Sequence, residues 1–436
     1  MEKENKNKLR DLYFVDSVFT PMEGDVSTVT LFPTEDEKEQ GARVLSLNSE
    51  QLKMTNHSGT IREGWFVFYN EDNNQQHFSY GNLSQYARQQ FRTFNRLQGH
   101  LLDRYLIPAE WEDATMLRRL ECSDTLDVIS YHVNVGHGNC SVILLCDGSF
   151  YQIWMVDCSV IDKSNWRNYS GNLETCFEAI KQRLGKSKNE PLIINRFFLT
   201  HTHYDHYNGL EYLVDKHYID NNTVCYINLY YHCASKCYTR VLDKLLNAGV
   251  RFIEPVSKNS IGAIRFLHPE CRIFRSKATV VGAPSEYRIV NSPLNDSSTV
   301  ILIALGKMSM AFPGDLEYKG FDNMSKSRRC SPFLCYSDYY VVSHHGSING
   351  HPNRPCMNEH LHRPCMNEHL PLPTILRCVE SYLKKSILMG RDGAYRGIYN
   401  PQVVNYYSKL PCGMIYTEKA PHYVELEWGS GKELYK

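Results

Sequence analysis

The chain has 436 residues, enough for two or three domains, and its 48 lysines and arginines are balanced by 48 aspartates and glutamates. The neutral total excludes a protein whose bulk charge drives binding to long polyanions, so any nucleic-acid contact would have to be local. The 15 scattered cysteines, the lack of a secretory signal pattern and the short apolar runs predict a cytoplasmic protein with reduced thiols and no membrane contact.

Residues 1–125 differ in pattern from the rest of the chain. Short alternating or aromatic runs, such as VSTVTLF and GWFVFYN, are separated by polar, turn-rich stretches, and a helix is predicted over residues 83–104. No chemical motif stands out, so we expect an accessory α+β domain of unknown role. The alternative is that these residues hold substrate or dock a protein partner.

From residue 126 the predicted strands and helices follow one another more closely. The apolar runs DVISYHVNV and SVILLC flank a Gly-His-Gly turn, QIWMVD ends at Asp157, and IINRFFLT leads into a histidine-rich stretch. Helices are predicted between some of the strands, whereas other strands follow in unbroken series. This mixture predicts an α/β domain over residues 126–436 in which two sheets lie between helices, rather than one doubly wound parallel sheet.

A short tandem repeat lies late in this region. Residues 354–362 read RPCMNEHLH and residues 363–371 read RPCMNEHLP. Nine residues are too few for a solenoid unit, so the repeat is interpreted as a duplication in a surface loop. Its histidines and cysteines could bind metal, but the proline at the start of each copy argues against a built site.

The stretch THTHYDHYNG at residues 200–209 places metal-binding residue types directly after an apolar strand. Alternate residues of an extended segment face the same way, so His201 and His203 should point to one place. Asp205 and His206 then lie where the next helix begins. Imidazoles and carboxylates are suitable ligands for divalent ions, and four of them could serve two ions. A histidine-rich surface loop is the weaker alternative.

Two later segments repeat this order of strand and then ligand. MSMAFPGDLE is an apolar strand followed by a Pro-Gly turn and Asp315, and YYVVSHHG is an apolar strand followed by His344 and His345. A carboxylate after a tight turn can bridge two ions about 3.5–4 Å apart. Each segment alone is a weak signal, but three in one chain strengthen one another.

The order of Asp157, HTHYDH, PGD and SHHGS resembles the metallo-β-lactamase fold hydrolases. More narrowly, it resembles the soluble catalytic domain of ComEC-like DNA-uptake competence proteins. That narrower likeness depends on VNVGHGNCSVI, FLHPE, NDSSTVILIALGKMSMAFPGDLE and the closing stretches SILMGRDGAYRGIYNPQVV and MIYTEKAPHYVEL, and it covers about residues 127–427. The resemblance implies an αββα sandwich for the domain after the N-terminal segment.

The resemblance also implies a centre with two divalent ions, zinc or manganese. One ion would be held by His201, His203, Asp315 and one further group. The other would be held by a second set: Asp205, His206, Asp315 and His344. The further histidine that lactamases and glyoxalases use has no clean match, and His232 and His268 are both candidates.

Three of these residues receive further roles. Asp157 would orient the histidine loop from behind without binding metal. Asp205 and His345 are the expected catalytic residues. His344 is chosen as the ligand because the residue directly after a strand usually points inward, so His345 would face substrate as a hydrogen-bonding group or a proton donor.

The expected reaction is hydrolysis. Two divalent ions flanking one water would lower its pKa toward ~7 and give a hydroxide that bridges the ions at neutral pH. The fold alone does not select among esters, lactams, thioesters and phosphodiesters. The resemblance favours a phosphodiesterase or nuclease, and Lys326, Arg328 and Arg329 lie between Asp315 and His344, where a loop over the site would meet phosphates.

The neutral total charge favours short single strands or nucleotides over long duplexes. Tyr204 and Tyr207 could stack on bases, or they could simply pack in the core. Two alternatives remain open. One is a hydrolase of small esters, thioesters or lactones, and the other is a partner-binding protein whose metal site is regulated or structural.

Overall fold

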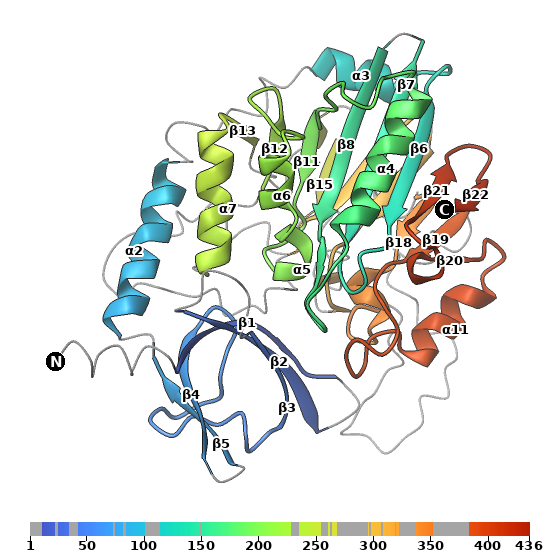
Figure 1. Cartoon of the computed structure of the whole chain (residues 1–436). Helices are drawn as coiled ribbons and strands as arrows, with labels where there is room; N and C mark the ends of the chain where they lie inside the picture. The colour runs from blue at the N-terminus through green and yellow to red at the C-terminus, as the bar shows by residue number, and fades with distance from the viewer. Residues whose placement is uncertain are drawn as a thin grey trace.

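The structure is a computed structural model, and it describes these residues: 11–21, 25–34, 42–72, 75–81, 84–100, 114–148, 150–227, 235–253, 260–261, 264–267, 295, 298–306, 308–318, 320–321, 337–351 and 383–436. Within them, the chain forms three large β-sheets with helices packed beside them (Figure 1). The predicted α/β class with more than one sheet is therefore confirmed. Among the described helices, none is long and apolar enough to cross a bilayer.

The N-terminal sheet has five antiparallel strands in the order β3-β2-β1-β4-β5. Its strands are β1 (Leu12–Phe19), β2 (Val26–Pro33), β3 (Arg43–Asn48), β4 (Phe66–Asp72) and β5 (Gln75–Tyr80). β-branched and aromatic residues favour extended backbone here, and successive side chains face opposite sides. Val15, Val29 and Leu31 therefore join an apolar cluster belonging to this sheet, while Leu12 and Phe14 pack against the rest of the protein.

The eight-stranded sheet has the order β13-β12-β11-β8-β7-β6-β21-β22. Its strands are β6 (Asp127–Val133), β7 (Cys140–Asp147), β8 (Phe150–Cys158), β11 (Arg196–Phe198), β12 (Val224–Tyr226), β13 (Arg251–Ile253), β21 (Tyr423–Glu427) and β22 (Glu433–Tyr435). The four strands from β13 to β8 run parallel, and parallel strands need crossover connections. Those connections contain α4 (Ser170–Arg183), α5 (Tyr204–Tyr207), α6 (Leu210–Asp215) and α7 (Lys236–Asn247).

The seven-stranded sheet has the order β14-β15-β16-β17-β18-β19-β20. Its strands are β14 (Ser260–Ile261), β15 (Ile264–Leu267), β16 (Val300–Leu305), β17 (Met308–Phe312), β18 (Tyr339–Val341), β19 (Lys385–Leu388) and β20 (Met414–Tyr416). The strands from β17 to β20 run parallel, and α11 (Pro401–Lys409) lies between β19 and β20 in the chain. This sheet thus has the same mixture of antiparallel and parallel pairs as the eight-stranded sheet.

The two larger sheets share one apolar cluster. Trp154 and Val156 enter it from β8, and Ile301 and Ile303 enter it from β16. Each pair is two residues apart, as expected for side chains on one face of a strand. The other face of the eight-stranded sheet packs with residues of α4, α6 and α7, and the other face of the seven-stranded sheet packs with residues of α11.

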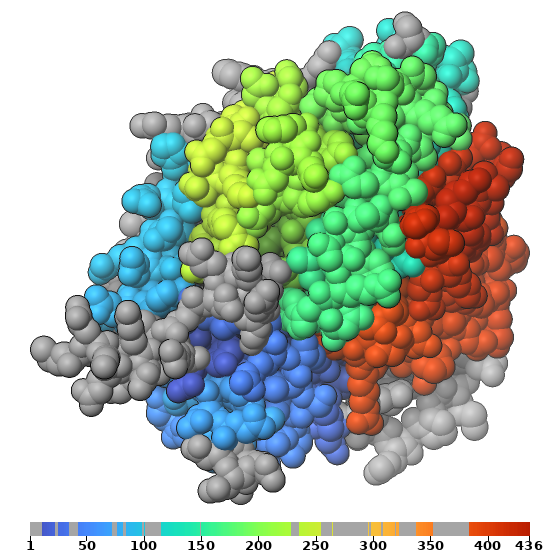
Figure 2. Space-filling model, viewed as in Figure 1, coloured from blue at the N-terminus to red at the C-terminus, as the bar shows by residue number. Residues whose placement is uncertain are grey.

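The N-terminal segment packs closely against the rest of the chain. The helix α2 (Gln85–His100) contacts α7, with the rings of Phe94 and Tyr238 6.3 Å apart, and α3 (Ala114–Cys122) contacts β16. In the space-filling view, the blue N-terminal sheet meets both the green middle and the orange-red C-terminal part of the chain (Figure 2). The boundary near residue 125 stays a prediction, but the parts on either side of it share an apolar core.

The remaining described elements are short. They are β9 (Ile161–Asp162), β10 (Arg167–Asn168), and the 3-10 turns η6 (Ser343–Gly346) and η7 (Thr417–Lys419). Of these, η6 matters most for function because it contains both histidines of the SHHG segment. The repeat at residues 354–371 lies outside the described residues.

Candidate metal centre

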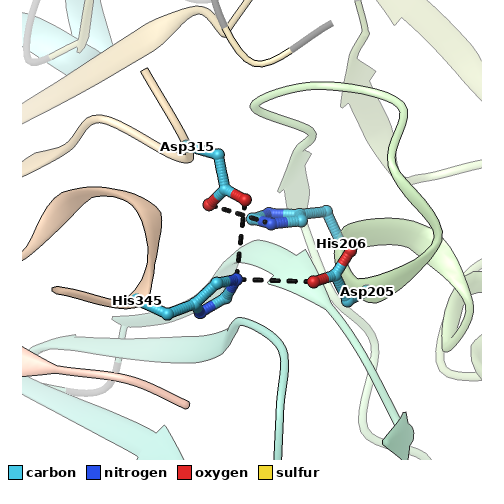
Figure 3. Close-up of side chains that lie close together, drawn as sticks. All are labelled: Asp205, His206, Asp315 and His345. Atoms are coloured by element: carbon cyan, nitrogen blue, oxygen red, sulfur yellow. Dashed lines mark ion pairs between the residues drawn. The ribbon is translucent and has the colours of Figure 1, made fainter. Parts of the chain in front are cut away.

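The predicted ligands converge at the carboxyl ends of strands from both large sheets. Possible ligand atoms of Asp205, His206, Asp315 and His345 all lie within 4.8 Å of one another. Asp205 and His206 come from α5, Asp315 from the turn after β17 and His345 from η6, and all four side chains point into one space (Figure 3). His201, His203 and Asp315 form a second group that meets the same distance limit. Asp315 belongs to both groups, which is the arrangement that a bridging carboxylate requires.

Asp315 occupies the centre of this geometry. Its Oδ1 lies 3.2 Å from Nε2 of His206. Its Oδ2 lies 3.5 Å from Nε2 of His345 and 3.9 Å from Nε2 of His201. The two oxygens of one carboxylate therefore face histidines from the strand-end cluster and from η6.

Several atoms of the cluster that could bind metal are buried and make no hydrogen bond with any residue that the structure describes. They are Asp205 Oδ2, His206 Nε2, Asp315 Oδ1 and His345 Nε2. Leaving a buried polar atom without a partner costs about 1–3 kcal/mol, and buried polar groups in folded proteins are nearly always satisfied. Four such atoms facing one space would be satisfied by a cation, so the residues present fit a divalent metal.

The charge around this space supports the same fit. Burial alone would raise the pKa of Asp315, but the nearby rings of His345, His206 and His344 hold it well below its usual range. Burial likewise opposes ionisation of Asp205, yet Lys163, together with His137 and His345, keeps its pKa well below the ordinary value. Both carboxylates are therefore charged and can bind a metal ion.

The approach of Asp315 to the histidines depends on Gly314. This residue has φ of +59°, a left-handed conformation that glycine adopts without strain. A Cβ added to it would lie 2.6 Å from Oγ1 of Thr200, the residue just before His201. The Pro-Gly-Asp turn can therefore lie against the end of β11 only because its middle residue has no side chain.

In η6 the structure places His345 among the possible metal ligands, where the sequence led us to expect His344. His345, rather than His344, belongs to the group with Asp205, and its Nε2 lies 3.4 Å from Asp205 Oδ2. His344 Nε2 lies 3.9 Å from Asp315 Oδ2, and its ring packs against that of Phe19. Both histidines have φ of +50°, so the chain turns sharply and the rule for a residue following a strand does not apply. The geometry thus favours His345 as the ligand, although the roles of both stay predictions.

Asp157 lies behind the cluster, where the sequence places it. Its Oδ2 is 2.8 Å from Nδ1 of His206, whose Nε2 faces Asp315. Asp157 also accepts hydrogen bonds from the backbone N–H and the hydroxyl of Thr200, both at 2.8 Å. A carboxylate in this position fixes the ring of a metal-binding histidine and the loop that carries it.

Two neighbouring residues were missed in the sequence. Lys163 follows β9, is buried, and places Nζ 2.7 Å from Asp205 Oδ1. His137, from the Gly-His-Gly turn, places Nε2 3.3 Å from Asp205 Oδ2, and its ring centroid lies 4.2 Å from that of His345. Burial, reinforced by His345, lowers the pKa of His137 to about 4, so this ring is neutral. The Gly-rich turn is a usable signal for His137, whereas DKSNW offers none for Lys163.

The N-terminal segment, for which no chemical motif was predicted, also reaches the centre. Asp16 of β1 is buried, with Oδ2 4.0 Å from Nζ of Lys163. Glu63, just before β4, places Oε1 3.8 Å from Nε2 of His203. Burial raises the pKa of Asp16 to about 6, although Lys163 and His203 act to lower it. The signal in the sequence is a lone acid within the apolar run LYFVDSVF.

A small cavity lies beside the cluster and has a volume of about 20 Å³, room for about one water molecule. Ser17, Thr28 and Thr30 line it from the N-terminal sheet, and Lys163 is the one lysine or arginine among its described lining residues. The cavity is thus covered by the N-terminal sheet and is rich in carboxylates and imidazoles.

Several predicted contacts do not lie at this cavity or fall outside the described residues. Tyr204 and Tyr207 are buried and pack against other aromatic rings, so the packing alternative is the one that the structure bears out. The predicted phosphate contacts and both candidate extra ligands lie outside the described part of the chain: Lys326, Arg328, Arg329, His232 and His268.

Comparison with known proteins gives little further information. No family model matches the chain, and no curated protein matches it. Among solved structures, the chain is similar to YhfI from Bacillus subtilis, a metallo-β-lactamase fold protein. The identity is 11%, the match covers 69% of this chain and 99% of that one, and the TM-score is 0.36. At this level of similarity, neither ligands nor substrates transfer to this chain.

Proposed function

We propose that this protein is a metal-dependent hydrolase with an αββα sandwich of the metallo-β-lactamase type. One observation carries the proposal: buried histidine and aspartate atoms from strand ends of two sheets meet around Asp315, and none of the described residues gives them a hydrogen bond. Maintaining such a cluster is costly unless it binds a cation. The resemblance of the HTHYDH, PGD and SHHGS segments to the metallo-β-lactamase fold hydrolases supports the same conclusion.

Two groups of residues would each hold one divalent ion. The first is His201, His203 and Asp315, which is rich in nitrogen and suits zinc. The second is formed by Asp205, His206, Asp315 and His345, whose two carboxylates also accept manganese. When bound, such ions supply Lewis acidity, which lowers the pKa of water and offsets negative charge that develops on the substrate.

Other residues of the chain would support the metal ligands and shield the centre from water. Asp157 and Lys163 fix His206 and Asp205 by contacts of 2.8 Å and 2.7 Å, so the ligands are held before substrate arrives. His137, kept neutral by burial, lies with Nε2 3.3 Å from Asp205 Oδ2 and helps to hold that carboxylate. The covering N-terminal sheet excludes bulk water, which strengthens electrostatic interactions inside.

A phosphodiester is the substrate that we propose. A basic surface on α2, which does not line the cavity, supports this choice: α2 carries Arg88, Arg92 and Arg96 at intervals of four residues, all exposed. Four residues advance a helix by about 6 Å, so the three guanidinium groups form a row along one side. None of them forms an ion pair within the described residues. The neutral total charge favours a short single strand or a nucleotide over a long duplex.

A second candidate is a hydrolase of small esters, thioesters or lactones. The cavity favours it, because the described lining contains the hydroxyls of Ser17, Thr28 and Thr30 and no free lysine or arginine. Hydroxyl groups recognise neutral carbonyl compounds as well as phosphates. The two candidate functions can therefore be distinguished only by measuring which substrates the protein hydrolyses.

The test combines metal analysis with a substrate panel. We expect purified protein to contain about two divalent ions per chain. With added Mn²⁺ or Zn²⁺, it should hydrolyse bis-p-nitrophenyl phosphate and short single-stranded DNA faster than a simple thioester. Turnover of the thioester alone would select the second candidate. Stoichiometric metal with no turnover of any substrate would instead support a partner-binding protein with a structural or regulated metal site.

A further inference from the structure

The first strand of the N-terminal sheet is distorted at one residue. Val15 pairs with Leu31 and Ser17 pairs with Thr30, so Asp16 has no partner in β2 and forms a β-bulge. Bulges change the direction of a side chain and are frequent beside active sites. Asp16 is 1% exposed, and within the described part of the chain neither of its carboxylate oxygens makes a hydrogen bond. A charged group buried in this way calls for a functional explanation.

The bulge aims Asp16 at the lysine that holds a predicted metal ligand. Nζ of Lys163 lies 4.0 Å from Asp16 Oδ2 and 2.7 Å from Asp205 Oδ1. Lys163 thus lies between the two carboxylates and occupies Oδ1 of Asp205. The other oxygen, Oδ2, makes no hydrogen bond among the residues described and faces Nε2 of His345 at 3.4 Å.

A second acid of the N-terminal segment faces a predicted ligand directly. Glu63 Oε1 lies 3.8 Å from Nε2 of His203, while Nδ1 of the same ring lies 3.0 Å from His201 Nε2. Glu63 is itself fixed, because its Oε1 accepts a hydrogen bond from the backbone N–H of Val18 at 3.0 Å. The arrangement repeats that of Asp157 behind His206, with one ring nitrogen toward the cluster and the other toward a carboxylate.

The N-terminal sheet is anchored to both halves of the centre. Phe32 of β2 packs on Tyr204, next to Asp205, with ring centroids 4.8 Å apart. Phe19 of β1 packs on His344 at 5.0 Å. The backbone oxygen of Thr20 accepts a hydrogen bond from the side chain of Asn349, just after η6. The sheet therefore spans the loops that both large sheets contribute to the centre.

We infer that the N-terminal sheet is part of the metal centre and that Glu63 and Asp16 are positioning residues. Glu63 orients His203, and Asp16 acts through Lys163 to orient Asp205. The inference rests on the proposed function, because it requires that these residues hold metal. It assigns the N-terminal segment a direct part in building the site, where the sequence predicts an accessory role.

The first experiment measures metal affinity in isosteric variants. Asp16→Asn and Glu63→Gln are compared with Asp25→Asn and Glu50→Gln, which change exposed acids of the same segment. Dissociation constants for Zn²⁺ and Mn²⁺ come from chelator competition, and thermal unfolding is followed in EDTA. Outer partners of metal ligands typically contribute 10–100-fold in affinity, so we expect about tenfold weaker binding in the first pair only.

Metal-free stability separates positioning from a purely structural role. Asp16→Asn removes a buried charge and leaves Lys163 paired with Asp205 at 2.7 Å, so the midpoint of unfolding in EDTA should stay the same or rise. A structural role would instead lower that midpoint and leave the affinity of the folded protein unchanged. Glu63→Ala is added as a second variant, and its loss of affinity should exceed that of Glu63→Gln, which keeps an acceptor for the His203 ring.

A double-variant cycle tests the route through Lys163. Asp16→Asn should weaken binding in the wild-type background and have no further effect in a Lys163→Met background. Equal weakening in both backgrounds would overturn this route, since Asp16 would then act by charge alone. If the wild type binds two ions and Asp16→Asn, Glu63→Gln and Glu63→Ala all match it in affinity, the inference fails while the proposed function stands. If the wild type binds no metal, both fail.

Discussion

Two sets of carboxylates meet at the candidate centre, and they reach it in different ways. Asp205 and Asp315 follow strands of the two large sheets, and their oxygens lie among the histidines. Asp16 and Glu63 come from the N-terminal segment, and their oxygens lie behind Lys163 and His203. The carboxylates that would bind metal thus lie in a histidine-rich cluster or after a recognisable turn. The carboxylates that would position the ligands are isolated acids in unrelated segments.

The largest expected effect tests the first set. Asp315→Ala removes the carboxylate shared by both groups, so metal content should fall from about two ions to near zero. Hydrolysis should fall by about 10³-fold or more, equivalent to ~4 kcal/mol of barrier. Asp243→Ala, an exposed position on α7, is the matched control and should change neither value. If Asp315→Ala weakened metal binding no more than Asp16→Asn does, the two sets of carboxylates would not differ in their role.

The next effect concerns η6. His345→Asn removes a donor from the four-residue group, so affinity for one ion should fall by at least ~100-fold, more than for a residue that only supports a ligand. His344→Asn should weaken binding by less than about tenfold. Metal titrations of both variants check this order. The reverse order would restore the assignment expected from the sequence.

A smaller effect separates close approach from backbone strain at Gly314. Alanine at this position must adopt positive φ and would also clash with Thr200. Gly148→Ala is the control, because Gly148 has φ of +64° and a methyl group added there would meet nothing within 4 Å. We expect about 1 kcal/mol of destabilisation for Gly148→Ala and about 1–3 kcal/mol more for Gly314→Ala. Only Gly314→Ala should also weaken metal binding, as measured by titration.

The smallest effect on the centre is expected from the basic row of α2. Replacing Arg88, Arg92 and Arg96 by Gln should leave metal binding unchanged. The salt dependence of binding to short single-stranded DNA should become shallower by about 2 in the log–log slope, as three lost phosphate contacts predict. Fluorescence anisotropy at several salt concentrations measures it. A control variant replaces three exposed lysines elsewhere: Lys53, Lys216 and Lys432. An equal change in the control would exclude α2 as a specific surface.

The strand-end part of the centre could be read from the sequence because its chemistry is local. In HTHYDH, four potential ligands lie within six residues directly after an apolar strand, and the topology of parallel strands brings such ends to one edge. Asp315 follows β17 of the other large sheet, so its place beside them is expected from the repeated order of strand and ligand and from the resemblance, not from this topology. Sheet topology does place Asp157, which lies near the end of β8, the strand paired with β11.

The remaining features depend on tertiary geometry that local patterns do not encode. The inward direction of His345 follows from left-handed backbone at two successive histidines, which no residue preference predicts. In the sequence Lys163 looks like an ordinary surface lysine. Only the folded structure shows that it is buried beside Asp16 and Asp205. From the sequence, Asp16 could be recognised only as an acid in an apolar strand. The bulge that sets the direction of its side chain depends on pairing with β2, which the sequence does not show.

The apolar core common to both sides of residue 125 has a practical consequence for anyone shortening this protein. Leu12, Phe14 and Phe91 are buried in the same cluster as residues of α7 and the eight-stranded sheet. A chain beginning at residue 126 would leave their apolar neighbours in water, a surface of the kind that promotes aggregation. Expression of residues 126–436 alone is therefore a poor route to well-behaved protein, and the N-terminal sheet and α2 should be kept with them.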